Sequence, residues 1–280
     1  MVSIPREHHF LPKFYTARWA SGGSLVRYVR PTPNAPLHGK SVVPKAIGKA
    51  RDLYAYSAGT TEEERQRLEL QFFGPIDNRA SEALQKIDAG QPGSLTEKVG
   101  LVQFVLSLQW RSPGRISDLR NELAGRMTGV ANFDSNDPAH QKMIADNIND
   151  LLEEMISSKN IVPMVASMKV FRVDVVSKHK LLSCDLPVMM SQGIAQPQGF
   201  LMFPYSPHRV AIFAHDEKVA AAFSTQEPDV LAKGLNDAVV RQARQFVIAA
   251  DPCSKRFVEN RFLKNFEPIP GDGLMRWGVP

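Results

Sequence analysis

The chain has 280 residues, of which 43% are hydrophobic and 22% are charged, values typical of a globular protein that buries a sizeable core. No run of about 18 apolar residues is present, so we expect no membrane-spanning helix, and the early charged residues lead us to expect no secretory signal. Its two cysteines, Cys184 and Cys253, lie far apart and indicate neither a disulfide framework nor a thiolate zinc site. We therefore predict a cytoplasmic protein with no membrane partner.

Positive charge is concentrated in residues 1–60, which we call the basic arm. The arm carries nine Lys and Arg against two acidic residues, whereas residues 61–280 carry 25 basic and 27 acidic residues. Pro31, Pro33, Pro36 and Pro44 restrict its backbone, so we expect it to wrap over the body with at most short strands, one of them within 24–31. Concentrated charge of this kind favours a phosphate-rich partner, and the alternative is a solvated surface.

Helical patterns fill the region 61–160. It opens with Thr61 and Glu64 in capping-box spacing. Apolar residues then recur every three or four positions, which predicts helices at the following stretches: 67–87, 94–110, 112–127 and 137–158.

The pattern changes to strands in the region 161–225. Runs rich in Val, Phe and Ile predict strands within 167–176, 181–190 and 199–215, and 227–248 returns to a helical pattern before a loop-like tail at 265–273. Because helices cluster and strands follow them, we predict an α+β protein with a central multi-helix body flanked by a small, mostly antiparallel sheet. We expect one domain over 1–280, with 226–280 as its C-terminal helix and tail.

Several nucleotide-binding and hydrolytic motifs are missing. The sequence contains no GxxxxGK[ST], GxSxG, HExxH or GxGxxG pattern. A P-loop, a nucleophile elbow, a zincin helix and a dinucleotide fingerprint therefore have no support.

Two adjacent histidines, His8 and His9, are the first candidates for chemistry. Neighbouring side chains diverge on a strand or a helix, so at most one of them is expected to act as a general base or metal ligand. The alternative is a structural pair that holds the arm to the body.

Three further charged residues are candidates. Arg111 and Arg115 flank a helix junction and could together clamp a phosphate or carboxylate, or they could cap helix ends instead. Asp185 follows a predicted strand, where a carboxylate serves either catalysis or a turn cap.

Five stretches, taken in order, resemble the family known as domain of unknown function 4238. They are EHHFLPKFYTARWA, LVQFVLSLQWRSPGR, LLSCDLPV, FPYSP and LNDAVVRQARQFVI, and they span most of the chain. The family's polar motif positions fall at His8, His9, Arg111, Asp185 and Asn236, and the resemblance implies a single domain without supplying a reaction.

This sequence departs from the family pattern at two positions with candidate supporting roles. Gln109 lies two rather than three places before the arginine, and Asp77 stands where the family has a glutamate, one methylene longer.

Two functional hypotheses follow. The preferred one is a binding module for an anionic partner, nucleic acid among the candidates, because a catalytic constellation usually gives a stronger spacing signal. The alternative is a hydrolase for a phosphate-containing substrate, in which an arm histidine meets Asp185 and either Asp77 or Glu69, with or without a divalent metal, while Arg111 neutralises developing charge.

Overall fold

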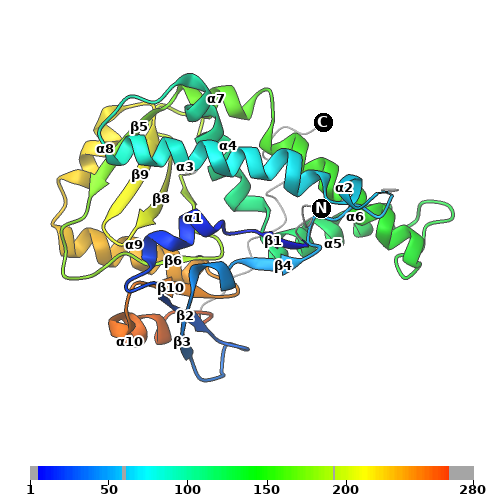
Figure 1. Cartoon of the computed structure of the whole chain (residues 1–280), viewed down its shortest axis with the longest axis horizontal. Coiled ribbons are helices and arrows are strands. Elements are labelled where there is room, and N and C mark those ends of the chain that lie inside the picture. Colours follow the sequence, from blue (N-terminus) through cyan, green and yellow to red (C-terminus); the bar gives the residue numbers. More distant parts are fainter. Residues whose placement is uncertain (1–5, 59–60, 192, 265–280) are drawn as a thin grey trace.

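The computed structural model describes residues 6–58, 61–191 and 193–264, in which helices pack against three small antiparallel sheets (Figure 1). The sheets have the strand orders β1-β4, β3-β2-β10-β6 and β5-β9-β8-β7. The strands are β1 (Glu7–His9), β2 (Leu25–Val29), β3 (His38–Val42), β4 (Lys49–Arg51), β5 (Lys169–Asp174), β6 (Ser183–Cys184), β7 (Met189–Met190), β8 (Phe200–Ser206), β9 (Arg209–Ala214) and β10 (Val247–Ala249). The predicted α+β class is confirmed.

Four helices that begin between residues 61 and 138 start at caps that the sequence indicates. Thr61 and Ser94 each form a complete capping box, and Ser112 and Asp137 accept backbone hydrogen bonds at the starts of their helices. The helices are α1 (Lys13–Thr16), α2 (Glu62–Arg65), α3 (Gly74–Asp88), α4 (Leu95–Trp110), α5 (Pro113–Met127), α6 (Pro138–Ile156), α7 (Ile161–Ser167), α8 (Glu217–Ser224), α9 (Pro228–Gln242) and α10 (Lys255–Glu259). Short 3₁₀ turns are η1 (Ala17–Trp19), η2 (Pro44–Ala46) and η4 (Pro252–Ser254), and η3 (Leu68–Phe73) is a π-helical turn.

The π-helical turn leads directly into α3, so Gly74 and Pro75 do not interrupt the helical path. Pro75 lies in the first turn of α3 and has no amide hydrogen to donate to the π-helical turn that precedes it. Single π-helical turns are frequent at functional sites, and this one carries Glu69.

The basic arm is part of the hydrophobic core. Tyr15 and Trp19 are fully buried in a cluster that also contains Phe104 of α4 and Phe203 of β8. The Tyr15 hydroxyl donates to the Pro204 carbonyl at 2.7 Å, and the indole of Trp19 donates to the Leu181 carbonyl at 3.0 Å. The arm therefore contacts both the helices and the strands of the body.

The prediction of one helix over 227–248 is wrong at its C-terminal end. Helix α9 ends at Gln242, and residues 247–249 form β10, which lies between β2 and β6. The Asp185 carboxylate accepts hydrogen bonds from the backbone N–H groups of Arg244 and Phe246, and this turns the chain away from the helix axis. The apolar, β-branched run that follows is well suited to a fully buried strand.

Some of the limits predicted from the sequence can be compared with the described residues. Within 6–58, 61–191 and 193–264, none of the helices has both the length and the apolarity needed to cross a bilayer. The helical region extends through α7, beyond the predicted limit at 160. The tail at 265–273 lies outside the described residues, and the single-domain organisation and the cytoplasmic location stay predictions.

Candidate functional site

Strand β1 separates the two histidines. In its antiparallel pairing with β4, His8 lies opposite Ala50 and His9 lies opposite Lys49. Successive side chains on a strand point to opposite faces, and His8 is fully buried whereas His9 is partly buried. The two imidazoles thus serve different environments, as their adjacency predicts.

Both ring nitrogens of His8 have structural partners. Nδ1 accepts a hydrogen bond from the Tyr54 N–H at 2.9 Å, so the proton of the neutral ring sits on Nε2, which donates to Oε1 of Gln66. The Tyr54 ring stacks on the imidazole with ring centroids 5.3 Å apart. Burial lowers the pKa of His8, although the Gln66 contact opposes the shift. His8 is held neutral and in one tautomer.

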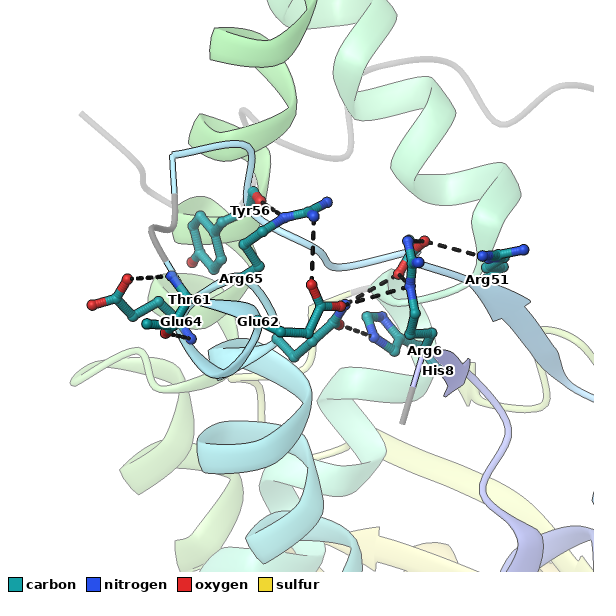
Figure 2. A network of polar contacts seen from close by, with 10 residues as sticks. Arg6, His8, Arg51, Tyr56, Thr61, Glu62, Glu64 and Arg65 are labelled. Carbon is teal, nitrogen blue, oxygen red and sulfur yellow. Dashed lines mark hydrogen bonds and ion pairs between the residues drawn. The ribbon is translucent and has the colours of Figure 1, made fainter. Parts of the chain in front are cut away.

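The His8 contact continues to the surface through side-chain amides and carboxylates (Figure 2). Gln66 donates to Oδ1 of Asp52 at 3.1 Å and to Oε1 of Glu62 at 3.0 Å. Arg6, which lies beside His8 in the figure, pairs with the Asp52 carboxylate. This chain of contacts joins β1 to the loop after β4 and to α2.

Arg111 lies at the C-terminal end of α4. It is completely buried, and its guanidinium lies over the rings of Phe73 and Phe104, at 5.3 and 5.6 Å from their centroids. The Tyr54 hydroxyl donates to the Arg111 carbonyl at 2.7 Å, which fixes the backbone there. Only Nη1 of the guanidinium is paired, to both carboxylate oxygens of Asp77 at 3.0 and 3.3 Å.

Glu69, Asp77 and His9 complete a group of titratable side chains around this guanidinium, which we call the Arg111 cluster. Burial raises the pKa of Glu69 to about 7 even though Arg111 opposes the shift. Burial likewise raises the pKa of Asp77 to about 6 against the pull of Arg111. Burial lowers the pKa of His9, and the charges of Lys49 and Arg111 lower it further.

Four buried atoms of the Arg111 cluster have no hydrogen-bond partner. They are Nε2 of His9, Oε2 of Glu69, and Nε and Nη2 of Arg111. Such atoms are rare in folded proteins and indicate a bound water, an ion or a ligand. The Arg111 cluster is therefore the strongest candidate functional site among the residues that the structure describes.

Asp185 is buried at the turn after α9 and caps that turn, and Arg115 is partly buried in the first turn of α5. The Asp185 carboxylate faces the backbone N–H groups of Arg244 and Phe246, at 3.0 and 3.4 Å, and burial raises its pKa to about 6. Oδ2 of Asp185 and Nε of Arg115 lack partners; burial lowers the pKa of Arg115, and the charge of Asp185 opposes that shift. This geometry favours the turn-cap interpretation of Asp185, and its catalytic role stays a prediction.

The two supporting amides hold backbone segments. Asn236 accepts from the Leu182 N–H at 2.7 Å and donates to the Lys180 carbonyl at 3.0 Å, so it fixes the approach to β6. Gln109 donates to the Val188 carbonyl at 3.0 Å and so ties α4 to the segment after β6.

The described residues provide no group of three or more His, Cys, Asp or Glu side chains arranged to hold a metal ion. The divalent metal considered above consequently has no set of protein ligands within 6–58, 61–191 and 193–264.

Sequence reasoning identified most of the Arg111 cluster and missed its surroundings. His9, Arg111 and Asp77 were singled out, and Glu69 was named only as an alternative carboxylate. Tyr54, which contacts both His8 and Arg111, belongs to no motif. A signal for Glu69 was present, because it is the one charged residue of the mostly apolar LELQFF run.

The comparisons with known proteins identify a family without a named activity. The family model described as "Protein of unknown function (DUF4238)" matches residues 7–252. No curated protein and no solved structure matches the chain.

Proposed function

We propose that this chain, which belongs to the DUF4238 family of proteins of unknown function, binds an anionic ligand at the Arg111 cluster. The observation that carries the proposal is the free edge of the Arg111 guanidinium. Nε and Nη2 are both buried and without a partner, while Nη1 alone is paired. These two N–H groups form one side of the rigid fork that binds two oxygens of a phosphate or carboxylate.

Electrostatic balance supports the same conclusion. A buried guanidinium with part of its hydrogen-bonding capacity unused is costly, and Asp77, whose side chain is 19% exposed, occupies only one of its nitrogens. A ligand anion would restore the missing contacts. The charge of Lys49 also acts at His9, so the basic arm adds positive potential beside the cluster.

Calorimetric titration tests the proposal with a panel of anions: inorganic phosphate, sulfate, acetate and a short single-stranded DNA. We expect at least one to bind, and Arg111→Met to weaken that binding about tenfold or more. Arg126→Met is the matched control, because Arg126 is exposed and pairs only with Glu122 among the contacts described. Arg111→Lys, which keeps the charge and loses the fork, serves if the methionine variant does not fold. Equal affinity in the Arg111 and Arg126 variants, or no binding at all, would contradict the proposal.

A second candidate function is hydrolysis of a phosphate-containing substrate. Oε2 of Glu69 is unpartnered, and its pKa of about 7 suits a group that accepts and returns a proton at neutral pH. In this case Glu69 would take the proton of an attacking water while Arg111 stabilised the charge on the phosphoryl oxygens. Release of nitrophenol from a nitrophenyl phosphate, lost in Glu69→Gln, would support it. Absence of turnover in the wild type would remove this candidate and leave the binding proposal intact.

A further inference from the structure

The free hydrogen-bonding atoms of the Arg111 cluster are of two opposite kinds. Nε and Nη2 of Arg111 are donors and can do nothing else. Oε2 of Glu69, once ionised, is an acceptor. A ligand that satisfies the whole cluster must therefore both accept and donate hydrogen bonds.

The imidazole of His9 is also an acceptor. Its backbone hydrogen bond to Lys45 favours the protonated ring, which identifies the carbonyl as the acceptor. Because Nε2 has no partner, that bond comes from Nδ1, and Nδ1 carries the proton of the neutral ring. Nε2 is left with a lone pair that faces no donor.

Most oxyanions can accept hydrogen bonds from Arg111 but have no hydrogen to donate to Glu69 or His9. An ionised carboxylate, a sulfate and a phosphate diester offer acceptors alone, so they would satisfy Arg111 and leave His9 and Glu69 without a donor. Their lone pairs would also repel the Glu69 carboxylate. A phosphate that keeps a P–OH group offers two or more acceptor oxygens and a donor in one compact group.

We infer that the ligand of the Arg111 cluster is a phosphate bearing at least one P–OH group, either inorganic phosphate or a terminal phosphate monoester. Arg111 donates to two of its oxygens, and Nε2 of His9 or Oε2 of Glu69 accepts from the P–OH. The inference rests on the proposed function and narrows its ligand class. Internal phosphates of nucleic acid are diesters and lack the P–OH, so a nucleic acid would be recognised at a phosphorylated end.

The charged groups facing Glu69 come from three elements. Arg111 of α4 and Asp77 of α3 act on its carboxyl, and the backbone N–H of His9 on β1 donates to it. Burial has the largest effect on the pKa of the Tyr54 phenol and raises it, whereas the charge of Arg111 lowers this pKa and the charge of Glu69 raises it. With its pKa near 7, Glu69 is mostly ionised at about pH 8, which is where the requirement for a ligand donor is strictest.

The test compares inorganic phosphate with sulfate by calorimetry on the full chain at about pH 8. The two ions have the same shape and nearly the same charge, and only phosphate keeps a proton there. We expect phosphate to bind about tenfold or more tightly, because a site built to accept a hydrogen bond rejects an analogue that lacks the donor. Two further titrations distinguish the source of the phosphate. At about pH 7, where Glu69 is partly ionised and a nucleoside 5′-monophosphate keeps part of its P–OH, the monophosphate should bind more tightly than dimethyl phosphate, which has no P–OH at any pH.

Glu69→Gln probes the acceptor directly, because an amide can donate to sulfate. We expect its preference for phosphate over sulfate to fall to within a few-fold, whereas Glu63→Gln, on an exposed position of α2, keeps the wild-type ratio. If the Glu69 variant does not fold, titrations of the wild-type protein with sulfate and dimethyl phosphate still test the inference. Equal binding of sulfate and phosphate, both weakened by Arg111→Met, would overturn the inference and leave the proposed function standing. Failure of both ions to bind would overturn the inference, and it would overturn the proposed function as well if acetate and the single-stranded DNA also fail to bind.

Discussion

Adjacent residues of identical type have different physical roles in this protein. His8 is buried with both ring nitrogens bonded inside the fold, whereas Nε2 of His9 is buried with no partner. The alternation of side chains along β1 produces this difference, since it sends one ring toward Gln66 and the other toward Arg111. The structural interpretation therefore suits His8, and the functional interpretation suits His9.

His8→Phe should destabilise the protein although it keeps a flat ring beside Tyr54. The change removes two hydrogen bonds and leaves Gln66 Oε1 and the Tyr54 N–H without their partner, at a cost of about 2–4 kcal/mol in the free energy of unfolding. Urea denaturation at about pH 7.5 measures this cost. His208→Phe, at an exposed turn, is the control and should change the free energy by less than about 0.5 kcal/mol.

The cost of His8→Phe should also depend on pH. Burial lowers the pKa of His8 below its ordinary value of 6.5, so the unfolded chain binds the proton more readily than the folded protein. The contribution of His8 is complete above about pH 6.5 and declines as the pH falls toward the lowered pKa. The stability difference between wild type and variant should consequently shrink at about pH 5. A difference that grows on acidification would show that folded His8 is protonated.

Part of the candidate site could be read from the sequence because residue type carries chemical capability. His9 and Arg111 were recognisable as a lone pair donor and an anion fork. The bonding partner of each group was not recognisable, because it depends on elements far away in the chain. Asp185 illustrates the limit: a carboxylate after a strand can face a ligand or cap backbone amides, and only the position of Phe246 shows which contact it makes.

At the scale of elements, local rules accounted for where helices begin and failed where a tertiary contact decides. The capping box at Thr61 is formed as predicted, and Ser94 forms a second one. The residues after Gln242 continue a helical pattern, yet they turn into β10, because Asp185 binds the intervening amides and a strand can pair there with β2 and β6. Pairing of the arm with a C-terminal strand leaves no trace in either segment alone.

The register of the basic arm depends on a close backbone approach at Gly48. Gly48 has a φ of +69°, and a Cβ placed there would lie 2.5 Å from Cβ of Leu11. The Leu11 N–H donates to the Gly48 carbonyl at 3.0 Å, so the two segments cannot separate without losing this bond. The same contact positions the end of β1, and with it His9.

Gly48→Ala should lower the free energy of unfolding by about 3 kcal/mol, the sum of left-handed strain and the clash with Leu11. Gly22→Ala is the matched control, because Gly22 has a φ of +58° and no atom within 4 Å of the added methyl group. Strain alone applies there, and we expect a loss of about 1 kcal/mol. Urea denaturation of both variants separates the two effects, and equal losses would show that the approach to Leu11 is not close.

At the scale of the whole molecule, the arm and the body share one set of contacts. Asp88 at the end of α3 accepts hydrogen bonds from Arg18 of the arm at 2.7 Å, from Arg209 of β9 at 2.8 Å and from the Tyr205 hydroxyl at 3.1 Å. The hydrophobic cluster around Tyr15 includes residues from the arm, the helices and both larger sheets. The positive charge of the arm is therefore displayed on a segment that the core holds in place.

If the chain is one cooperative unit, the arm should unfold together with the helical body. Native-state hydrogen exchange in low urea measures this, and we expect peptides covering 13–20 and 100–110 to open with the same free energy and the same urea dependence. Tyr15→Phe sharpens the test, since it removes the hydroxyl shared with Ser183 and the Pro204 carbonyl. Loss of these bonds should lower both opening free energies equally, by about 1–3 kcal/mol. A different result would be that 13–20 opens at a clearly lower free energy and that Tyr15→Phe leaves the 100–110 peptide unaffected. The basic arm would then unfold separately from the body, and His9 would lie near Arg111 only while the arm is folded.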